Sequence, residues 1–210
     1  MPSSKIGHTI KNRESPKDVF LTPEPLAIRH IEIVSKIYEE NKYDGIWLDP
    51  CKGTGNYYNN FPDIEKDWCE IADNKDFYKY DKNISTIIGN PPYSHLKTFI
   101  QKIIELKPDI ISLLLSNLSV THRKLSDMEQ AGYIVTNLEV CKVFSWYSES
   151  NIITWEKKTR PEQVSILQFN MTIYRTPEDE KSRKEKSKNN KRKCGICKKI
   201  GHDRRKCPEK

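Results

Sequence analysis

The sequence predicts an α/β fold built on a mostly parallel β-sheet whose last two strands are antiparallel. Three observations carry this prediction: a short apolar segment that runs into a glycine-rich turn, an apolar run that ends in two prolines, and alternating helical and strand patterns around them. The 210-residue chain is long enough for one sizeable domain and a small C-terminal appendage.

The elements follow from apolar periodicity. A period of 3.6 predicts helices over residues 25–41 and 95–107. The predicted strands cover residues 46–49, 68–71, 84–89, 109–115, 133–144 and 164–175. Residues 109–115 are a continuous apolar run, which is typical of a strand buried on both faces of a parallel sheet.

The first strand runs into a turn that begins at Asp49 and contains Gly53 and Gly55. Both glycines tolerate positive φ and let a ligand approach the backbone, as in the first strand-to-helix turn of doubly wound folds. The turn is therefore a candidate ligand site.

The third strand ends in Asn90-Pro91-Pro92-Tyr93. Two prolines fix φ and remove two backbone donors, so the strand stops in a rigid loop. Such a loop can hold the Asn90 amide and nearby carbonyls as fixed acceptors, with the Tyr93 ring as a stacking surface for a flat substrate.

Together these segments resemble the N6-adenine methyltransferases, which use S-adenosylmethionine on a Rossmann-like sheet. The resemblance spans roughly residues 16–175 and includes residues 18–23, which resemble the segment that closes over the methionine end of the cofactor. It implies that cofactor is bound by Thr22, Pro23, Asp49, Gly53, Gly55, Glu70, Asp76 and Phe77. Asp49 would orient the turn and the methionine amino group, Glu70 would accept the ribose hydroxyls, and Asp73 is a rival for that role.

The resemblance also implies a mechanism in which Asn90, Pro91, Pro92 and Tyr93 are the catalytic residues. The Asn90 side-chain oxygen and the Pro91 carbonyl would accept the two amine hydrogens of adenine, so that its lone pair points at the methyl group. Tyr93 would stack on a base extruded from its helix.

Two features depart from the family pattern. Five residues separate Glu70 from Asp76, which leaves no room for the helix that usually joins the second and third strands. Lys52 occupies a position that is usually filled by a small residue, and the sequence does not explain it.

The C-terminal region carries the spacing of a zinc knuckle, with three cysteines and one histidine as ligands: Cys194, Cys197, His202 and Cys207. A segment this small has no core to fold on without metal, so Zn²⁺ is a predicted cofactor. The domain prediction is a methyltransferase domain over residues 1–177, a basic flexible linker over 178–193 and the knuckle over 194–208.

The basic charge lies in the tail. Residues 178–210 contain 14 Lys and Arg against 6 Asp and Glu, a net charge of +8, whereas the whole chain has +7. The first 177 residues therefore sum to −1, and the tail is predicted to bind a polyanion. Knuckles generally bind single-stranded nucleic acid, and Arg204 and Arg205 are candidate contacts.

A second candidate nucleic-acid contact is an aromatic and basic loop predicted between the last two strands. It contains Trp146, Tyr147, Trp155, Lys157, Lys158 and Arg160. Bases can stack on such rings, although the rings could equally pack against the edge of the sheet. The chain has no room for a large target-recognition domain, so the knuckle, this loop or a partner subunit would select the substrate.

Two other function classes stay open: an inactive methyltransferase-like protein that binds nucleic acid, and a glutamine methyltransferase acting on a protein, because that family shares the Asn-Pro-Pro-Tyr loop. RNA and DNA substrates are not distinguished. The three cysteines outside the knuckle are scattered, as in reduced intracellular proteins. No membrane span or secretory leader is predicted, so we expect a soluble protein of the cytoplasm or nucleus. The abundant Lys, Asn and Ile would suit an AT-rich genome such as that of a large virus.

Overall fold

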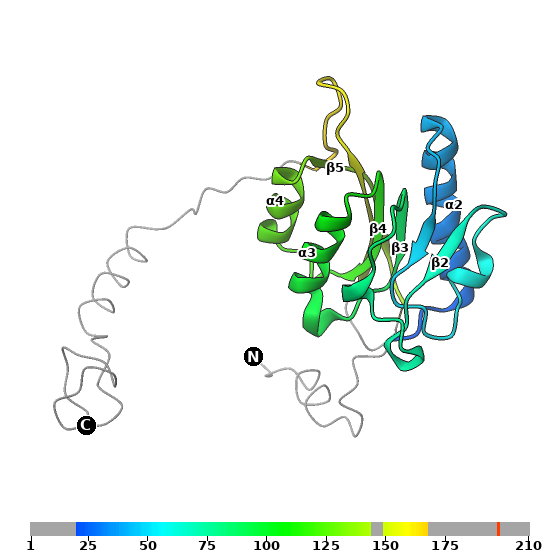
Figure 1. The fold of residues 1–210 in the computed structure, drawn as a ribbon. Helices are drawn as coiled ribbons and strands as arrows, with labels where there is room; N and C mark the ends of the chain where they lie inside the picture. The colour runs from blue at the N-terminus through cyan, green and yellow to red at the C-terminus, as the bar shows by residue number, and fades with distance from the viewer. Residues whose placement is uncertain (1–19, 144–148, 168–196, 198–210) are drawn as a thin grey trace. The chain divides into compact units, whose positions relative to one another are not determined.

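The computed structural model describes residues 20–143, 149–167 and 197 (Figure 1). The chain divides into two units, Met1–Phe169 and Asn170–Lys210, and the sheet belongs to the first. Among the described residues six strands form one sheet in the order β2-β1-β3-β4-β6-β5. The strands are β1 (Trp47–Asp49), β2 (Lys66–Trp68), β3 (Thr86–Gly89), β4 (Ile110–Ser116), β5 (Tyr133–Cys141) and β6 (Ser150–Lys157).

The strand directions agree with the sequence prediction. β1 pairs in parallel with β2 and β3, and β3 pairs in parallel with β4. β6 is antiparallel to both β4 and β5. The predicted mostly parallel sheet with a final antiparallel pair is therefore confirmed.

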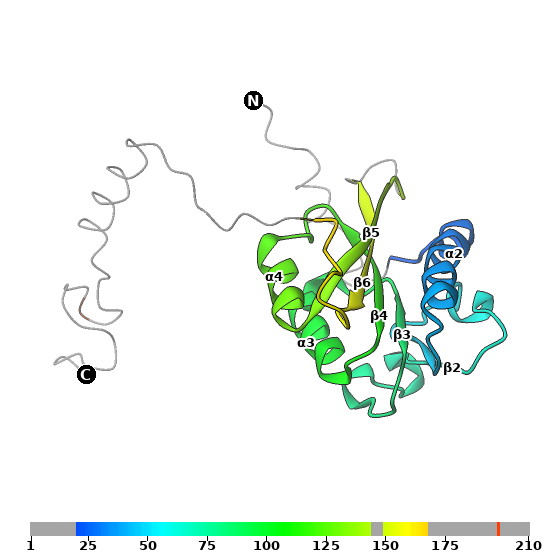
Figure 2. The same ribbon diagram turned by 90° about the horizontal axis from the view of Figure 1, so that it is seen from above.

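Helices cover both faces of the sheet. The α-helices are α2 (Glu24–Asn41), α3 (Leu96–Leu106) and α4 (His122–Gln130). α2 lies against one face, and α3 and α4 lie against the other (Figure 1 and Figure 2). None of the helices in the described part of the chain combines the length and the apolar character that a membrane span requires.

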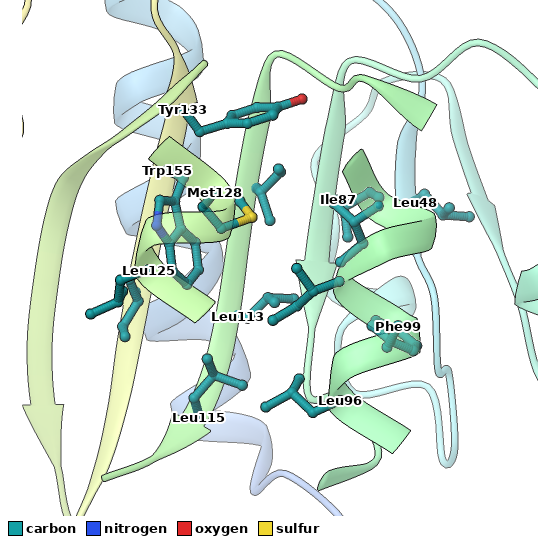
Figure 3. Packing of buried hydrophobic residues seen from close by; sticks show 14 of the residues in the cluster. Leu48, Ile87, Leu96, Phe99, Leu113, Leu115, Leu125, Met128, Tyr133 and Trp155 are labelled. Atoms are coloured by element: carbon teal, nitrogen blue, oxygen red, sulfur yellow. The ribbon is translucent and has the colours of Figure 1, made fainter. Parts of the chain in front are cut away.

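The core consists of two apolar layers, one on each face of the sheet. Successive strand residues point to opposite faces, so Leu48 and Ile87 pack with α3 and α4, whereas Trp47 and Ile88 pack with α2. Figure 3 shows the layer beneath α3 and α4. Both faces of the central strands are buried, which explains their continuous apolar sequences.

The prediction for the last strand was wrong. The partner of β5 is β6 at Ser150–Lys157, which the sequence analysis assigned to a loop, and not a strand at 164–175. β6 lies between β4 and β5 and buries both faces, so polar Thr154 and Glu156 are as buried as their apolar neighbours and no alternation is visible. Residues 164–167 form no strand, and residues 168–175 lie outside the described part of the chain.

The sequence predicted the connection after β2 correctly and the connection after β4 incorrectly. The polar segment after β4 starts α4, which was not predicted because the helix buries only Leu125 and Met128. The expected lack of a helix after Glu70 is confirmed. The 3-10 turns η2 (Ile71–Asp73) and η3 (Phe77–Lys79) are the only helical elements between β2 and β3.

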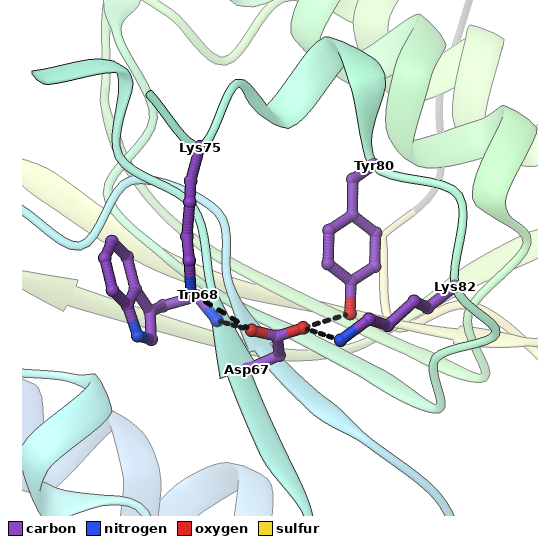
Figure 4. A network of polar contacts seen from close by, with 5 residues as sticks. All are labelled: Asp67, Trp68, Lys75, Tyr80 and Lys82. Atoms are coloured by element: carbon purple, nitrogen blue, oxygen red, sulfur yellow. Dashed lines mark hydrogen bonds and ion pairs between the residues drawn. The ribbon is translucent and has the colours of Figure 1, made fainter. Parts of the chain in front are cut away.

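A polar network closes the sheet edge at β2. The Asp67 carboxylate accepts hydrogen bonds from the Tyr80 hydroxyl (3.2 Å) and the Lys82 ammonium (2.6 Å), and Lys75 lies 3.9 Å away (Figure 4). Partial burial raises the pKa of Asp67, but the hydrogen bond from Lys82 opposes this and the net pKa is lowered. These charged contacts hold the η3 segment beside β2 and discourage further strand pairing.

Candidate active site

The candidate site forms where β1 and β3 end. These parallel strands are neighbours, so the turn after Asp49 and the loop that starts at Asn90 emerge at the same edge of the sheet. A cleft of about 320 Å³ lies at this edge. Six of the predicted site residues line it: Gly53, Glu70, Asp76, Phe77, Asn90 and Pro92.

A second, smaller cavity of about 30 Å³ is lined by Gly53 and Asn90 as well, and by Thr22. Five predicted catalytic and cofactor residues line neither cavity: Pro23 precedes α2, Asp49 ends β1, Gly55 is in the turn, and Pro91 and Tyr93 are in the loop after β3. Asp49 is fully buried beneath the turn.

The turn after β1 depends on its two glycines. Gly53 has φ +51° and Gly55 has φ +88°, values that side chains rarely permit. A Cβ atom on Gly55 would lie 2.8 Å from the Asn59 side-chain nitrogen. The Gly53 N–H donates to Glu70 Oε2 at 2.9 Å, so the turn and the acidic residue after β2 are joined directly.

Asp49 supports the turn from below. Its Oδ1 accepts the Cys51 N–H at 3.1 Å, whereas its Oδ2 is buried and has no hydrogen-bond partner among the described residues. Burial raises the pKa of Asp49 to about 7, and the backbone N–H groups of Cys51 and Tyr58 oppose that shift. A buried carboxylate with one unpartnered oxygen suits a cationic ligand group.

The Asn90 amide has a fixed orientation. Its Nδ2 donates to the Phe20 carbonyl at 2.8 Å, which turns Oδ1 toward the opposite side. Oδ1 is buried and has no hydrogen-bond partner in the described part of the chain, although the amide lines the cleft. Buried acceptors are normally paired, so this oxygen is a fitting acceptor for an N–H group of a ligand.

Residues 20–23 lie across the two loops. The Phe20 carbonyl is held by Asn90, and the Thr22 carbonyl accepts the Asn56 amide at 2.8 Å. The Phe20 ring lies 5.8 Å from the Tyr93 ring, and the Tyr93 hydroxyl donates to the Leu114 carbonyl at 3.4 Å. Residues 18 and 19 of the predicted cofactor segment lie outside the described residues.

Glu70, and not Asp73, reaches the cleft. Glu70 Oε2 accepts the Gly53 N–H, and Oε1 accepts the Ala72 N–H at 3.2 Å. Asp73 is exposed in η2 and lines neither cavity. Of these two acidic residues, Glu70 alone lines the cleft.

The cleft also contains residues that sequence reasoning did not assign: Ile71, Lys75, Tyr78, His95 and Phe99. Ile71 is 76% exposed although it is apolar, and its position directly after Glu70 was a usable signal. His95, the residue before α3, is exposed and lines the cleft.

The structure explains why a lysine occupies position 52 in the turn. Its ammonium lies 3.9 Å from the centre of the Trp68 ring, and the Lys75 ammonium lies 3.7 Å from the same centre. Cations over an aromatic face are attracted by the ring quadrupole. Lys52 therefore ties the glycine turn to the edge strand β2.

A buried histidine links α2 to the same region. His30 is paired through Nδ1 with the Tyr57 hydroxyl (2.9 Å) and through Nε2 with Ser112 Oγ (2.7 Å). Burial lowers the pKa of His30 to about 3, so the ring is neutral at physiological pH. Tyr57 directly follows the turn, and this network fixes its position.

The predicted aromatic and basic loop is not one element. Trp155 belongs to β6 and is 2% exposed, and Lys157 is the last residue of that strand. The Lys157 N–H donates to the carbonyl of Asp109, just before β4 begins, which is the end of the sheet opposite Asn90. Lys157, Lys158 and Arg160 are thus separated from the cleft. Trp146 and Tyr147 lie outside the described residues.

The predicted knuckle falls almost entirely outside the described part of the chain. Cys197 is described, in a turn and half-buried, whereas Cys194, His202, Cys207, Arg204 and Arg205 are not. Within the described residues no group of three or more potential ligand side chains could hold a metal ion. This leaves the zinc prediction without a structural test.

No protein-family model matches the sequence, and no curated protein matches it. A proposed class I S-adenosylmethionine-dependent methyltransferase from Listeria monocytogenes is similar in structure, with a TM-score of 0.57 and 14% identity over 88% of this chain and 75% of that one. A proposed RNA methyltransferase from Pyrococcus horikoshii gives 0.52 and 15% over 72% and 97%. The chain therefore has the class I methyltransferase fold.

Proposed function

We propose that this protein transfers a methyl group from S-adenosylmethionine to the exocyclic amine of adenine in nucleic acid. The observation that carries the proposal is the Asn90 amide, whose nitrogen is held by the Phe20 carbonyl and whose buried oxygen has no partner among the described residues. An amine has two hydrogens to donate, and this acceptor lies at the edge of the sheet where class I folds bind their ligands.

The chemical task explains why a fixed acceptor suffices. The lone pair of an exocyclic purine amine is delocalised into the ring, so the amine is a weak nucleophile. Asn90 Oδ1 and the Pro91 carbonyl would each accept one amine hydrogen and draw the nitrogen toward tetrahedral geometry. They would also stabilise the positive charge that develops as the new bond forms. The cofactor would leave as S-adenosylhomocysteine, and the acidic methylated amine would lose its extra proton to water, so no strong base is required.

The cleft residues fit the proposed cofactor. S-adenosylmethionine supplies an electrophilic methyl group on a sulfonium. Asp49 is buried beneath the turn whose residues line both cavities, and its carboxylate would attract a cationic amino group. Glu70 would accept ribose hydroxyls, and exposed Ile71 with Phe77 would contact a flat base. Tyr93, half-buried against Phe20, would stack on the substrate adenine.

Replacing Glu70 by Gln is expected to weaken cofactor binding about tenfold, because a neutral amide accepts hydroxyl hydrogen bonds less strongly than a carboxylate. Calorimetric titration with S-adenosylmethionine measures this. Asp73→Asn is the matched control, since it removes a neighbouring charge outside the cleft and should leave the affinity unchanged. Equal losses in both variants would show that only the overall charge matters.

For the tail we propose a zinc knuckle at Cys194, Cys197, His202 and Cys207 that assists nucleic-acid binding. The support is the donor set itself, since three thiolates and one imidazole at short spacing suit tetrahedral Zn²⁺. The net charge of +8 over residues 178–210 would attract the phosphate backbone.

Removal of residues 178–210 is expected to weaken nucleic-acid binding by about tenfold or more near 0.1 M salt and to flatten its salt dependence, because phosphate contacts release counterions. Fluorescence anisotropy over a salt series measures both. Cofactor affinity should stay the same and serves as the control for folding. If the slope against salt survives the truncation, the cations that bind phosphate lie elsewhere.

The proposed activity is tested by transfer of labelled methyl to oligonucleotides. Single-stranded RNA, single-stranded DNA and duplex DNA are each compared with a version in which every adenine is replaced by purine, which lacks the exocyclic amine. Label only in the adenine-containing set is the expected result. Label in added protein would instead favour a glutamine methyltransferase, and binding without label would favour an inactive binder.

A further inference from the structure

The turn that joins β4 to α4 covers residues 117–121 (Figure 1). Leu118 is 74% exposed, although every residue of β4 before it is buried. Single exposed leucines are common on protein surfaces and need no explanation by themselves. Two features distinguish Leu118: hydrogen bonds fix the turn that carries it, and this turn lies at the edge of the sheet where the candidate site forms.

Hydrogen bonds on both sides of Leu118 hold the turn. The Ser119 N–H donates to the Ser116 carbonyl at 2.8 Å, and the hydroxyls of the same two serines are 2.9 Å apart. The Lys124 ammonium reaches back from α4 and donates to the Ser119 carbonyl at 2.6 Å. The leucine is therefore presented by an ordered backbone, as a group that enters another molecule must be.

The turn lies at the same edge of the sheet as the candidate site. β3 and β4 are parallel, Gly89 pairs with Leu113, and the Tyr93 hydroxyl bonds to the Leu114 carbonyl. β4 neighbours β3 on the side opposite β1, so the turn lies away from the glycine turn. A base that reaches Asn90 from this side would carry its neighbouring nucleotides past Leu118.

Two cationic or potentially cationic side chains follow directly. His122 and Arg123 are exposed in the first turn of α4. The positive end of a helix macrodipole adds to their field, and phosphates are stabilised at such positions. An apolar tip flanked by groups that bind phosphate matches the chemistry of side chains that enter a base stack.

On the basis of the adenine methylation proposed above, we propose that Leu118 is a wedge that fills the stack when the target adenine is extruded, with His122 and Arg123 on the adjacent phosphates. Extrusion breaks stacking on both sides of the base, and an apolar side chain in the gap restores part of that contact. The preferred substrate would then be a stacked, base-paired adenine in a duplex or stem, and not an unpaired one.

The test compares Leu118→Ser with Val164→Ser, a matched control at a 77% exposed valine in the segment after β6. Labelled methyl transfer is measured to one adenine in three settings: paired in a duplex, opposite an abasic site, and in an unstructured strand. We expect Leu118→Ser to slow transfer about tenfold to the paired adenine and to the adenine opposite an abasic site, which are both stacked, and to change transfer to the unstructured strand less than twofold. Val164→Ser should change none of them, and thermal unfolding checks that both variants fold.

A second readout does not depend on methyl transfer. A duplex with 2-aminopurine at the target becomes fluorescent when that base is unstacked, and we expect the unmodified protein, but not Leu118→Ser, to produce the increase. Equal slowing on all three substrates, or fluorescence that Leu118→Ser preserves, would overturn the wedge. Fluorescence without transfer to any substrate would overturn the proposed function and leave the wedge standing.

Discussion

Replacing Asn90 by Ala is expected to lower the rate of methyl transfer about 10³-fold, because the buried amide oxygen that would fix the amine hydrogens is lost. The side chain lines the cleft without supplying a charge for the cofactor, so the dissociation constant for S-adenosylmethionine should change about threefold at most. Single-turnover transfer of labelled methyl and calorimetry measure the two quantities.

Asn56→Ala is the control for this prediction. Asn56 donates to the Thr22 carbonyl at 2.8 Å much as Asn90 donates to the Phe20 carbonyl at 2.8 Å, so each substitution removes one tie to residues 20–23. Only Asn90 also offers an unpartnered buried oxygen. A similar loss of transfer rate in the two variants would mean that Asn90 acts by holding residues 20–23. Its role as an acceptor for the amine hydrogens would then be wrong.

Replacing Asp49 by Asn is expected to stabilise the fold and weaken cofactor binding together. The pKa of Asp49 is about 7 in the folded protein, against the ordinary 3.8, because the carboxyl is buried. Between these two values the folded state retains a proton that the unfolded state has released, so the contribution of Asp49 to stability is lost as pH rises to about 7. The asparagine cannot ionise, so its advantage in the free energy of unfolding should grow from near zero at pH 4 to about 4 kcal/mol at pH 8.

Ionisation of Asp49 lowers the stability of the fold but should raise the affinity for the cofactor. An ionised Asp49 attracts the methionine ammonium, so we expect affinity for S-adenosylmethionine to rise from pH 5.5 to pH 7.5 in the unmodified protein and to stay flat in Asp49→Asn. Denaturant unfolding and calorimetry at matched pH values measure the two effects. A parallel pH dependence of affinity in both proteins would remove Asp49 from the cofactor site.

The parts of the site that the sequence predicted are those under strong local constraint. Gly53 and Gly55 adopt positive φ, which few other residues tolerate, and the prolines after Asn90 force the chain out of β3. These constraints leave signatures in a few adjacent residues. The continuous apolar sequence of β4 likewise revealed a strand buried on both faces.

The features that were missed depend on contacts between distant segments. The Phe20 carbonyl that orients Asn90 is 70 residues away in sequence, and Lys52 is explained only by Trp68 across the sheet edge. β6 was missed because its polar Thr154 is buried and paired with Ser112 at 2.7 Å, so its pattern looked like a loop. No single-sequence pattern contains such partners.

The most direct measurement is the identity of the nucleoside that receives the methyl group. Adenine-containing RNA and DNA are incubated with S-adenosylmethionine and either the unmodified protein or Asn90→Ala, digested to nucleosides and analysed by mass spectrometry. N6-methyladenosine or its deoxy form, present with the unmodified protein and absent with the variant, is the predicted result. A methyl group on another base or another adenine nitrogen, or equal N6-methylation by Asn90→Ala, would contradict it.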